Sequence, residues 1–253
     1  MSKRRRILLP LAVALLAAAL YAILHSQPEP SYQGRSLSSW LAEFDQDLTN
    51  RASMLLGEVS PEENSSESQR RQNATEAVCQ IGTNALPCLL SWIRYEPPAW
   101  QEKLDDLFQR LGLPWNPGRQ ERRQHDLQAD KAEIAFQILG PSAKTAIPEL
   151  TRLSNAAKTL DSAMRCMHAL SCLGEGALPP LVNVLTNATG NKGPAMYAIW
   201  TMGTNARPAV PALIQCLKDQ DRSVRDDAAS YLGQLKLEPG LVVPALTTAP
   251  GPS

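Results

Sequence analysis

The stretch that decides the fold is Ala198-Ile-Trp-Thr-Met-Gly203-Thr-Asn-Ala-Arg-Pro-Ala-Val-Pro211-Ala-Leu213. Small apolar residues lead to a glycine, a short turn of small residues follows, and Pro-x-Leu comes next. The same order recurs around Gly82, Gly140, Gly174 and Gly233, with spacings of 58, 34, 29 and 30 residues. A unit of about 30 residues cannot bury its own apolar face and must stack on its neighbours. We therefore predict an all-α solenoid, a superhelix of helix-turn-helix repeats.

The residue types within each unit explain its turn. Each glycine follows a last apolar helical residue, where a left-handed backbone conformation ends the helix and glycine adopts it without steric cost. A proline comes a few residues later, where the first turn of the next helix tolerates the missing N–H. The expected structural residues are Gly82, Gly140, Gly174, Gly203 and Gly233 with Pro87, Pro148, Pro179 and Pro211, and small alanines at 77, 135, 169, 198, 228 and 229 let helices approach closely.

The fifth unit resembles a known repeat family. It reads Leu217-Lys-Asp-Gln-Asp221-Arg-Ser-Val224-Arg225-Asp-Asp-Ala228-Ala229-Ser-Tyr-Leu232-Gly233 and is similar to the HEAT-repeat consensus, in the form also seen in phycobilisome-lyase-like HEAT proteins. The other units keep the glycine, alanine and Pro-x-Leu positions but lose the Val-Arg pair. The resemblance covers roughly residues 70–247 and extends to bacterial envelope proteins built from such repeats. It implies a HEAT-type solenoid in which Asp221 and Arg225 form a polar ladder along the turns, with a ligand role for Arg225 as the alternative.

Composition narrows the possible partners. The chain has 25 basic and 25 acidic residues, and four of the basic ones, Lys3, Arg4, Arg5 and Arg6, precede an apolar run. The remainder therefore carries 21 basic against 25 acidic residues, a net charge of about −4. This balance leaves no strongly basic surface, so we expect no nucleic-acid partner.

The apolar run is the expected targeting segment. Ile7 to Leu24 is eighteen uncharged residues, broken only by Pro10, and as a helix it would span roughly 27 Å, close to a hydrocarbon core. Basic residues before it predict a signal anchor in the bacterial inner membrane with the repeats facing the periplasm. The alternative is a signal peptide cleaved near Ala17-Ala-Ala19, which leaves a secreted or periplasmic protein.

The domain plan follows from composition and periodicity. We expect a signal anchor or signal peptide over 1–25, a linker over 26–35, and an N-terminal capping helix that starts after Ser36 and is followed by a mobile polar loop, over 36–72. The repeat solenoid is expected over 73–253, with an insertion at about 95–120 that contains a helix from Trp100 to Leu111. No stretch of the sequence shows the alternation of apolar and polar residues that would predict a strand.

The residue types that carry chemistry do not cluster. None of the five cysteines forms a Cys-x-x-Cys pair, and His25, His125 and His168 are far apart, so we predict no metal, cofactor or catalytic site. Most cysteines lie at apolar helix positions and are expected to be buried, with a Cys79–Cys88 disulfide as the alternative. His125 beside Asp126 could be an acid–base pair, but a solvated helix face is expected there. Trp92 and Trp200 are expected in the core.

The sequence therefore predicts a non-catalytic scaffold that binds protein partners. Curved solenoids bind along the surface of the second helices, here near 86–94, 143–154, 178–186 and 206–218. The alternatives are a lyase-like or enzyme-accessory role, implied only by the resemblance, and a purely structural or decayed repeat protein. We also expect the C-terminal repeat, which Pro250 and Pro252 cut short, to leave Leu232, Leu235 and Leu246 uncovered and to be mobile or self-associating. The expected partner contacts are Arg94, Trp100, Trp115, Arg152, Asn183, Gln215 and Lys218.

Overall fold

The computed structural model describes residues 29–44, 61–96, 98, 103, 108, 110, 117–187 and 191–248. These residues are mostly helical, which confirms the all-α class. Within them no helix combines the length and the apolar character needed to cross a membrane. The expected anchor over 7–24, the residues Trp100 and Trp115 and most of the expected helix 100–111 lie outside the described residues.

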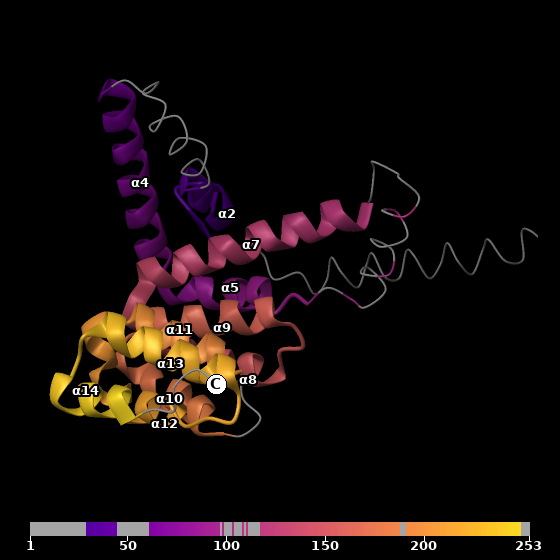
Figure 1. Ribbon diagram of the computed structural model, residues 1–253. Helices are drawn as coiled ribbons and strands as arrows, with labels where there is room; N and C mark the ends of the chain where they lie inside the picture. The colour runs from indigo at the N-terminus through magenta and orange to yellow at the C-terminus, as the bar shows by residue number, and fades with distance from the viewer. Residues whose placement is uncertain are drawn as a thin grey trace, which may run out of the picture.

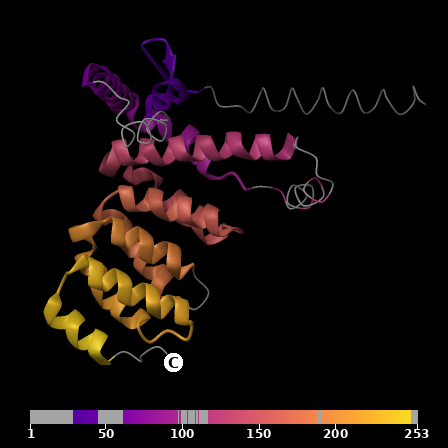
Figure 2. The ribbon, with the colours of Figure 1, turned by 45° about the horizontal axis from the view of Figure 1, so that its top comes forward.

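The helices pair into hairpins that follow one another along the chain (Figure 1). The second helix of each hairpin packs against the first helix of the next, and successive first helices also pack together. Figure 2 shows the later hairpins as layers below α7. The hairpins are α4 (Pro61–Ile81) with α5 (Leu86–Ile93), α7 (Pro117–Leu139) with α8 (Ile147–Ala156), α9 (Leu160–Cys172) with α10 (Leu178–Thr186), α11 (Lys192–Thr201) with α12 (Val210–Cys216), and α13 (Arg222–Leu235) with α14 (Pro239–Thr248).

Short 3-10 turns join the helices of the first four hairpins. They are η2 (Gly82–Ala85), η3 (Gly140–Ala146), η4 (Glu175–Ala177), which follows Gly174, and η5 (Gly203–Ala209). Gly203 has a φ of 57°, and a Cβ there would meet no heavy atom within 4 Å, so backbone conformation alone favours glycine. At Gly174, with a φ of 80°, a Cβ would also lie 3.3 Å from Pro141 of the preceding turn. The positive φ predicted for Gly82, Gly140, Gly174 and Gly203 is confirmed, as is the place of Pro87, Pro148, Pro179 and Pro211 in the first turn of the next helix.

One core runs through the stacked hairpins. Phe136 of α7, Met167 of α9 and Met196 of α11 are almost fully buried, and the other helices of the stack add aliphatic side chains to the same cluster. The repeat alanines are buried too, which lets neighbouring helices approach closely; Ala229 alone is half-buried among Ala77, Ala135, Ala169, Ala198, Ala228 and Ala229. Trp92 packs against the core as expected, although it is half-buried.

The N-terminal region departs from the expected linker. Residues 31–36 form an antiparallel hairpin of β1 (Ser31–Tyr32) and β2 (Arg35–Ser36), whose two-residue turn has positive φ at both Gln33 (50°) and Gly34 (75°), as type I′ turns require. Ser36 then caps α2 (Leu37–Leu41) by accepting from the Ser39 N–H, which confirms the predicted start. A 3-10 turn, η1 (Ala42–Phe44), follows α2 directly, and the rest of the expected capping helix lies outside the described residues.

The polar stretch from 58 to 72, expected as a mobile loop, is helical from Pro61 as part of α4. Polarity prevents burial but does not prevent helix formation, because glutamate, glutamine and arginine are good helix formers. Pairs one turn apart add support: Arg71 binds Glu67 at 2.6 Å and Gln69 binds Asn73 at 3.1 Å. In the later part of α4, Val78 and Ile81 reach the core, and Ala74 and Ala77 pack in a smaller cluster with Trp40. Figure 1 shows the helix extending away from the other hairpins. At the end of the insertion, the basic run 119–123 likewise belongs to a helix, because α7 begins at Pro117.

The last hairpin corrects three expectations. Gly233 lies inside α13, and the left-handed residue that ends this helix is Lys236 with a φ of 52°. The helix runs on because Leu235 still packs against the core. The final helix, α14, begins at Pro239 instead of Pro244, which gives it ten residues before Ala249. Because α14 packs on α12 and α13, Leu232 is buried and Leu235 and Leu246 are partly covered, whereas Leu241 and Val243 are exposed.

Candidate functional site

Two of the expected contact residues meet on the side of the second helices. Arg94, at the end of α5, and Arg152 of α8 are exposed, and both donate to Glu149 at 2.7 Å. The hydrogen bond from Arg152, together with that from Arg94, lowers the pKa of Glu149 to about 2. One carboxylate thus pairs with two cations, and the cluster keeps a formal charge of +1. Exposed pairs of this kind are worth little energy, so we interpret the cluster as a surface link between α5 and α8.

The other described contact residues are spread along the second helices. Asn183 of α10 is exposed, and so are Gln215 and Lys218 at the end of α12. Gln215 and Lys218 line a shallow cleft of about 400 Å³, which does not reach Asn183 or the arginine cluster. The structure therefore does not bring the five described contact residues into one site.

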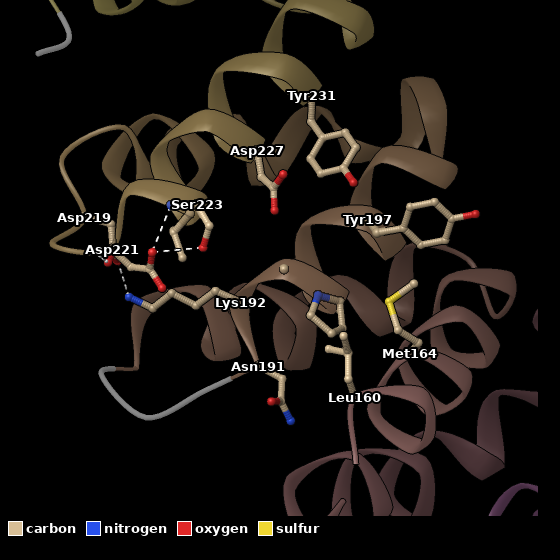
Figure 3. A pocket seen from close by; sticks show the side chains of 13 residues that line it. Leu160, Met164, Asn191, Lys192, Tyr197, Asp219, Asp221, Ser223, Asp227 and Tyr231 are labelled. Atoms are coloured by element: carbon tan, nitrogen blue, oxygen red, sulfur yellow. Dashed lines mark hydrogen bonds and ion pairs between the residues drawn. The ribbon is translucent and has the colours of Figure 1, made fainter. Parts of the chain in front are cut away.

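A second surface, lined by charged and aromatic side chains, lies on the first helices of the hairpins. A cleft of about 520 Å³ between α9, α11 and α13 adjoins one of about 420 Å³ between α7, α9 and α11, and the two share Met164 and Tyr197. We call their combined lining the first-helix groove. Figure 3 shows Asp227 and Tyr231 of α13 pointing toward α11, with Leu160 and Met164 of α9 on the far side of the opening. The groove is lined by Asp126, Asp130, Glu133, Leu160, Asp161, Met164, Arg165, His168, Asn191, Lys192, Gly193, Pro194, Tyr197, Asp219, Asp221, Ser223, Val224, Asp227 and Tyr231.

Aromatic rings form a row across three first helices at this groove. The ring centroids of His168 and Tyr197 are 6.2 Å apart, those of Tyr197 and Trp200 are 5.7 Å apart, and those of Trp200 and Tyr231 are 5.8 Å apart. All four side chains are half-buried, and Trp200, expected in the core, belongs to this row instead. Burial raises the pKa of the Tyr231 hydroxyl, with a further contribution from the nearby Asp227. The tyrosine and tryptophan rings of the row therefore present neutral aromatic faces beside carboxylates.

The groove is strongly acidic. Seven carboxyl groups line it against two cations, Arg165 and Lys192, so its formal charge is −5 when His168 is neutral. Several carboxylates are engaged: Asp219 binds Lys192, which lowers the pKa of Asp219, and Asp126 binds Arg165 at 3.2 Å. Asp161 and Asp227 have no hydrogen-bond or ion-pair partner within the described part of the chain.

Helix starts position the ends of this groove. Asp221 caps α13 by accepting from the Ser223 N–H at 2.8 Å, and Thr159 caps α9 by accepting from the Ser162 N–H at 3.2 Å. Arg225 donates to the carbonyls of Asp219 and Gln220, both at 3.0 Å, so it holds the turn between α12 and α13. Gly193 lies beside α13, where a Cβ would be in ordinary van der Waals contact with the carboxylate of Asp227 at 3.7 Å.

Among the described histidines and cysteines, only His168 pairs with a charged side chain. His168 Nδ1 lies 2.7 Å from the carboxylate of Glu133, and this hydrogen bond raises the pKa of His168. His125 stacks on Tyr95 with centroids 3.8 Å apart, and Asp126 beside it pairs with Arg165. All five cysteines are free thiols, so Cys79 and Cys88 form no disulfide. Cys79 is exposed, whereas burial raises the pKa of the Cys166 thiol to about 12. Among the residues that the structure describes, no group of three histidine, cysteine, aspartate or glutamate side chains could hold a metal ion.

The sequence carries a signal for this groove that single motifs do not reveal. Asp130, Met164, Gly193 and Ser223 each stand ten residues before a repeat glycine, and His168, Tyr197 and Asp227 stand six before one. Positions four residues apart share a helix face, so aligning the units on their glycines places all seven on one surface.

No protein-family model, no curated protein and no solved structure matches this chain. The resemblance of residues 217–233 to HEAT repeats accordingly stays a prediction, beside the helical hairpins that the structure describes.

Proposed function

We propose that this protein is a non-catalytic protein-binding scaffold, a HEAT-type α-solenoid whose partner lies in the first-helix groove. The groove itself carries the proposal, because it draws side chains from α7, α9, α11 and α13 and so offers one partner contacts on four successive hairpins. Repeat proteins typically bind along such extended surfaces.

The HEAT-type architecture is supported by local structure. The hairpins pack in sequence order, left-handed glycines end four of the first helices, and the turns stack on one another. Asp221 and Arg225 are the two residues that the resemblance places in the inter-repeat turns. Asp221 caps the start of α13 by accepting from the Ser223 N–H, and Arg225 donates to carbonyls of the turn that precedes α13.

We further propose that residues 7–24 tether the scaffold to the bacterial inner membrane, with the repeats in the periplasm. Two measurements test this location. The full-length chain should stay with membranes after a carbonate wash, and protease added to spheroplasts should digest the repeats. Recovery of a soluble periplasmic chain that lacks its first residues would instead establish cleavage of the leader.

Photo-crosslinking in intact cells tests the binding surface. A benzoylphenylalanine replaces Leu160, which is 64% exposed at the mouth of the groove. Matched variants carry it at Asn183 or Gln215, exposed on the second helices. We expect a discrete crosslinked protein from position 160 alone. A product only from position 183 or 215 would move the interface to the second helices, and the absence of any product would contradict the scaffold function.

A further inference from the structure

We propose that the first-helix groove binds an extended segment of a partner protein that carries an arginine or lysine at every third residue. This inference rests on the proposed scaffold function and adds the chemistry of the partner. Its basis is the juxtaposition of unpaired carboxylates and aromatic faces at a spacing set by the helix stack.

Charge selects a cationic occupant. The groove has a formal charge of −5 with His168 neutral and −4 with His168 protonated, and Asp161 and Asp227, on two different first helices, lack hydrogen-bond and ion-pair partners within the described residues. A phosphate-bearing ligand such as a nucleic acid or an anionic lipid headgroup would be repelled. A basic segment would be drawn toward the groove and would supply the missing partners for both carboxylates.

The larger cleft fits one long basic side chain. Leu160, Met164 and Val224 offer apolar contact to the methylene stem of a lysine or arginine, while Asp227 is available to pair with its charged head. The rings of Tyr197 and Tyr231 line the same cleft and add cation–π attraction. A partner helix would instead need a mainly apolar groove, which this acidic lining does not provide.

The helix stack sets the spacing between such contacts. Neighbouring packed helices lie about 8–10 Å apart. A polyproline II segment advances about 3.1 Å per residue with three residues per turn, so every third side chain points the same way at intervals of about 9 Å. Basic residues at every third position therefore have the same spacing as α9, α11 and α13, whereas consecutive basic residues do not.

Fluorescence anisotropy on the full-length protein in detergent tests the proposal with three labelled peptides. The first is four repeats of Arg-Pro-Pro, the second has the same composition with its four arginines consecutive, and the third replaces arginine by glutamate. We expect the first to bind at least tenfold more tightly than the second, and the third not to bind. Equal affinity for the first two would overturn the spacing argument and leave only unspecific attraction.

Two groove variants locate the site. Asp161→Asn and Asp227→Asn remove carboxylates that have no partner in the described structure, so both should fold as the wild type does. Each should weaken the first peptide about tenfold, the loss expected for one charge-assisted contact. Asp226→Asn is the matched control, because Asp226 is the neighbouring residue on α13 but is exposed and pairs with Arg222 at 3.5 Å. Equal effects of the three variants, or none from the groove pair, would overturn the site.

The outcomes separate this inference from the scaffold function. A crosslinked partner at position 160 together with no binding of the Arg-Pro-Pro peptide would leave the scaffold function in place and refute the basic extended occupant. The absence of a crosslinked product at positions 160, 183 and 215 alike would refute the scaffold function itself.

Discussion

Gly203 and Gly233 hold corresponding places in the sequence repeat but differ in backbone conformation. Gly203 has a φ of 57° at the start of η5, whereas Gly233 lies within α13, and a Cβ at either position would meet no heavy atom within 4 Å. Gly203→Ala should cost about 1–2 kcal/mol, because a left-handed alanine is strained. Gly233→Ala should stabilise by roughly 0.5 kcal/mol, because glycine weakens a helix interior. Urea unfolding of both variants measures this, and a shift of the same sign for both would contradict the assigned conformations.

The His168–Glu133 pair predicts a pH-dependent contribution to stability. The carboxylate raises the pKa of His168 in the folded state above its unfolded value of about 6.5. The pair therefore stabilises fully below pH 6.5, and this stabilisation is lost as the pH rises through the folded-state pKa. Glu133→Gln should lower the melting temperature more at pH 6 than at pH 9. The control Asp226→Asn should show no such difference, and a Glu133→Gln effect that is equal at both pH values would argue against the pair.

At the scale of the element, the start of α13 depends on one side chain. Asp221 accepts from both the backbone N–H and the hydroxyl of Ser223, at 2.8 and 2.9 Å. Asp221→Ala should cost about 1 kcal/mol, while Asp221→Asn, which retains a capping oxygen, should cost much less. Asp226→Ala on the same helix serves as the control and should be nearly neutral. Chemical denaturation compares the three, and equal stability of the two Asp221 variants would show that the cap contributes nothing.

Sequence patterns predicted those elements whose ends are marked by backbone chemistry. Gly203 and Pro211 bracket a turn because left-handed φ and a missing N–H are tolerated only there, and this logic held at four of the five repeat glycines. It failed at Gly233, where α13 continues to Leu235, which packs against the core. The sequence patterns also failed over 61–72. The helix there lacks an amphipathic pattern and is supported by helix propensity and by side-chain pairs one turn apart.

The groove was harder to predict than the helices. Arg94 and Arg152 are exposed as expected, but exposure alone does not produce a site, and the two arginines are tied to Glu149. The contacts of Tyr197 with His168 and of Trp200 with Tyr231 depend on how far one hairpin is displaced from the next. That displacement follows from packing among several helices, which no single repeat encodes.

For the whole molecule, the hairpin order predicts where unfolding begins. The α13–α14 hairpin has a neighbour on one side only within the described chain, and stacked units owe much of their stability to neighbouring interfaces. Hydrogen exchange should show residues 222–248 opening before residues 160–218. Leu241 and Val243 on α14 are 55% and 56% exposed. Self-association of the C-terminal repeat therefore remains a prediction, with these two side chains as its contact surface. Protection that rises with concentration would support such association, and uniform protection of both regions at all concentrations would contradict the early opening.

The 3-10 turns restrict how the length of this chain can vary. Counted from glycine to the buried alanine before the next helix, η2 has four residues, η3 seven, Gly174–Ala177 four, and η5 seven. The increment of three is one full 3-10 turn, and each extra residue would rotate the next helix by about 120°. We therefore expect these turns to tolerate insertions of three residues but not of two. Duplicating Thr83-Asn84-Ala85 should leave Leu89 and Ile93 facing the core, whereas inserting only Thr-Asn should turn them outward. A much lower melting temperature for the two-residue insertion than for the three-residue one would show that insertions and deletions at these links are accepted in whole turns.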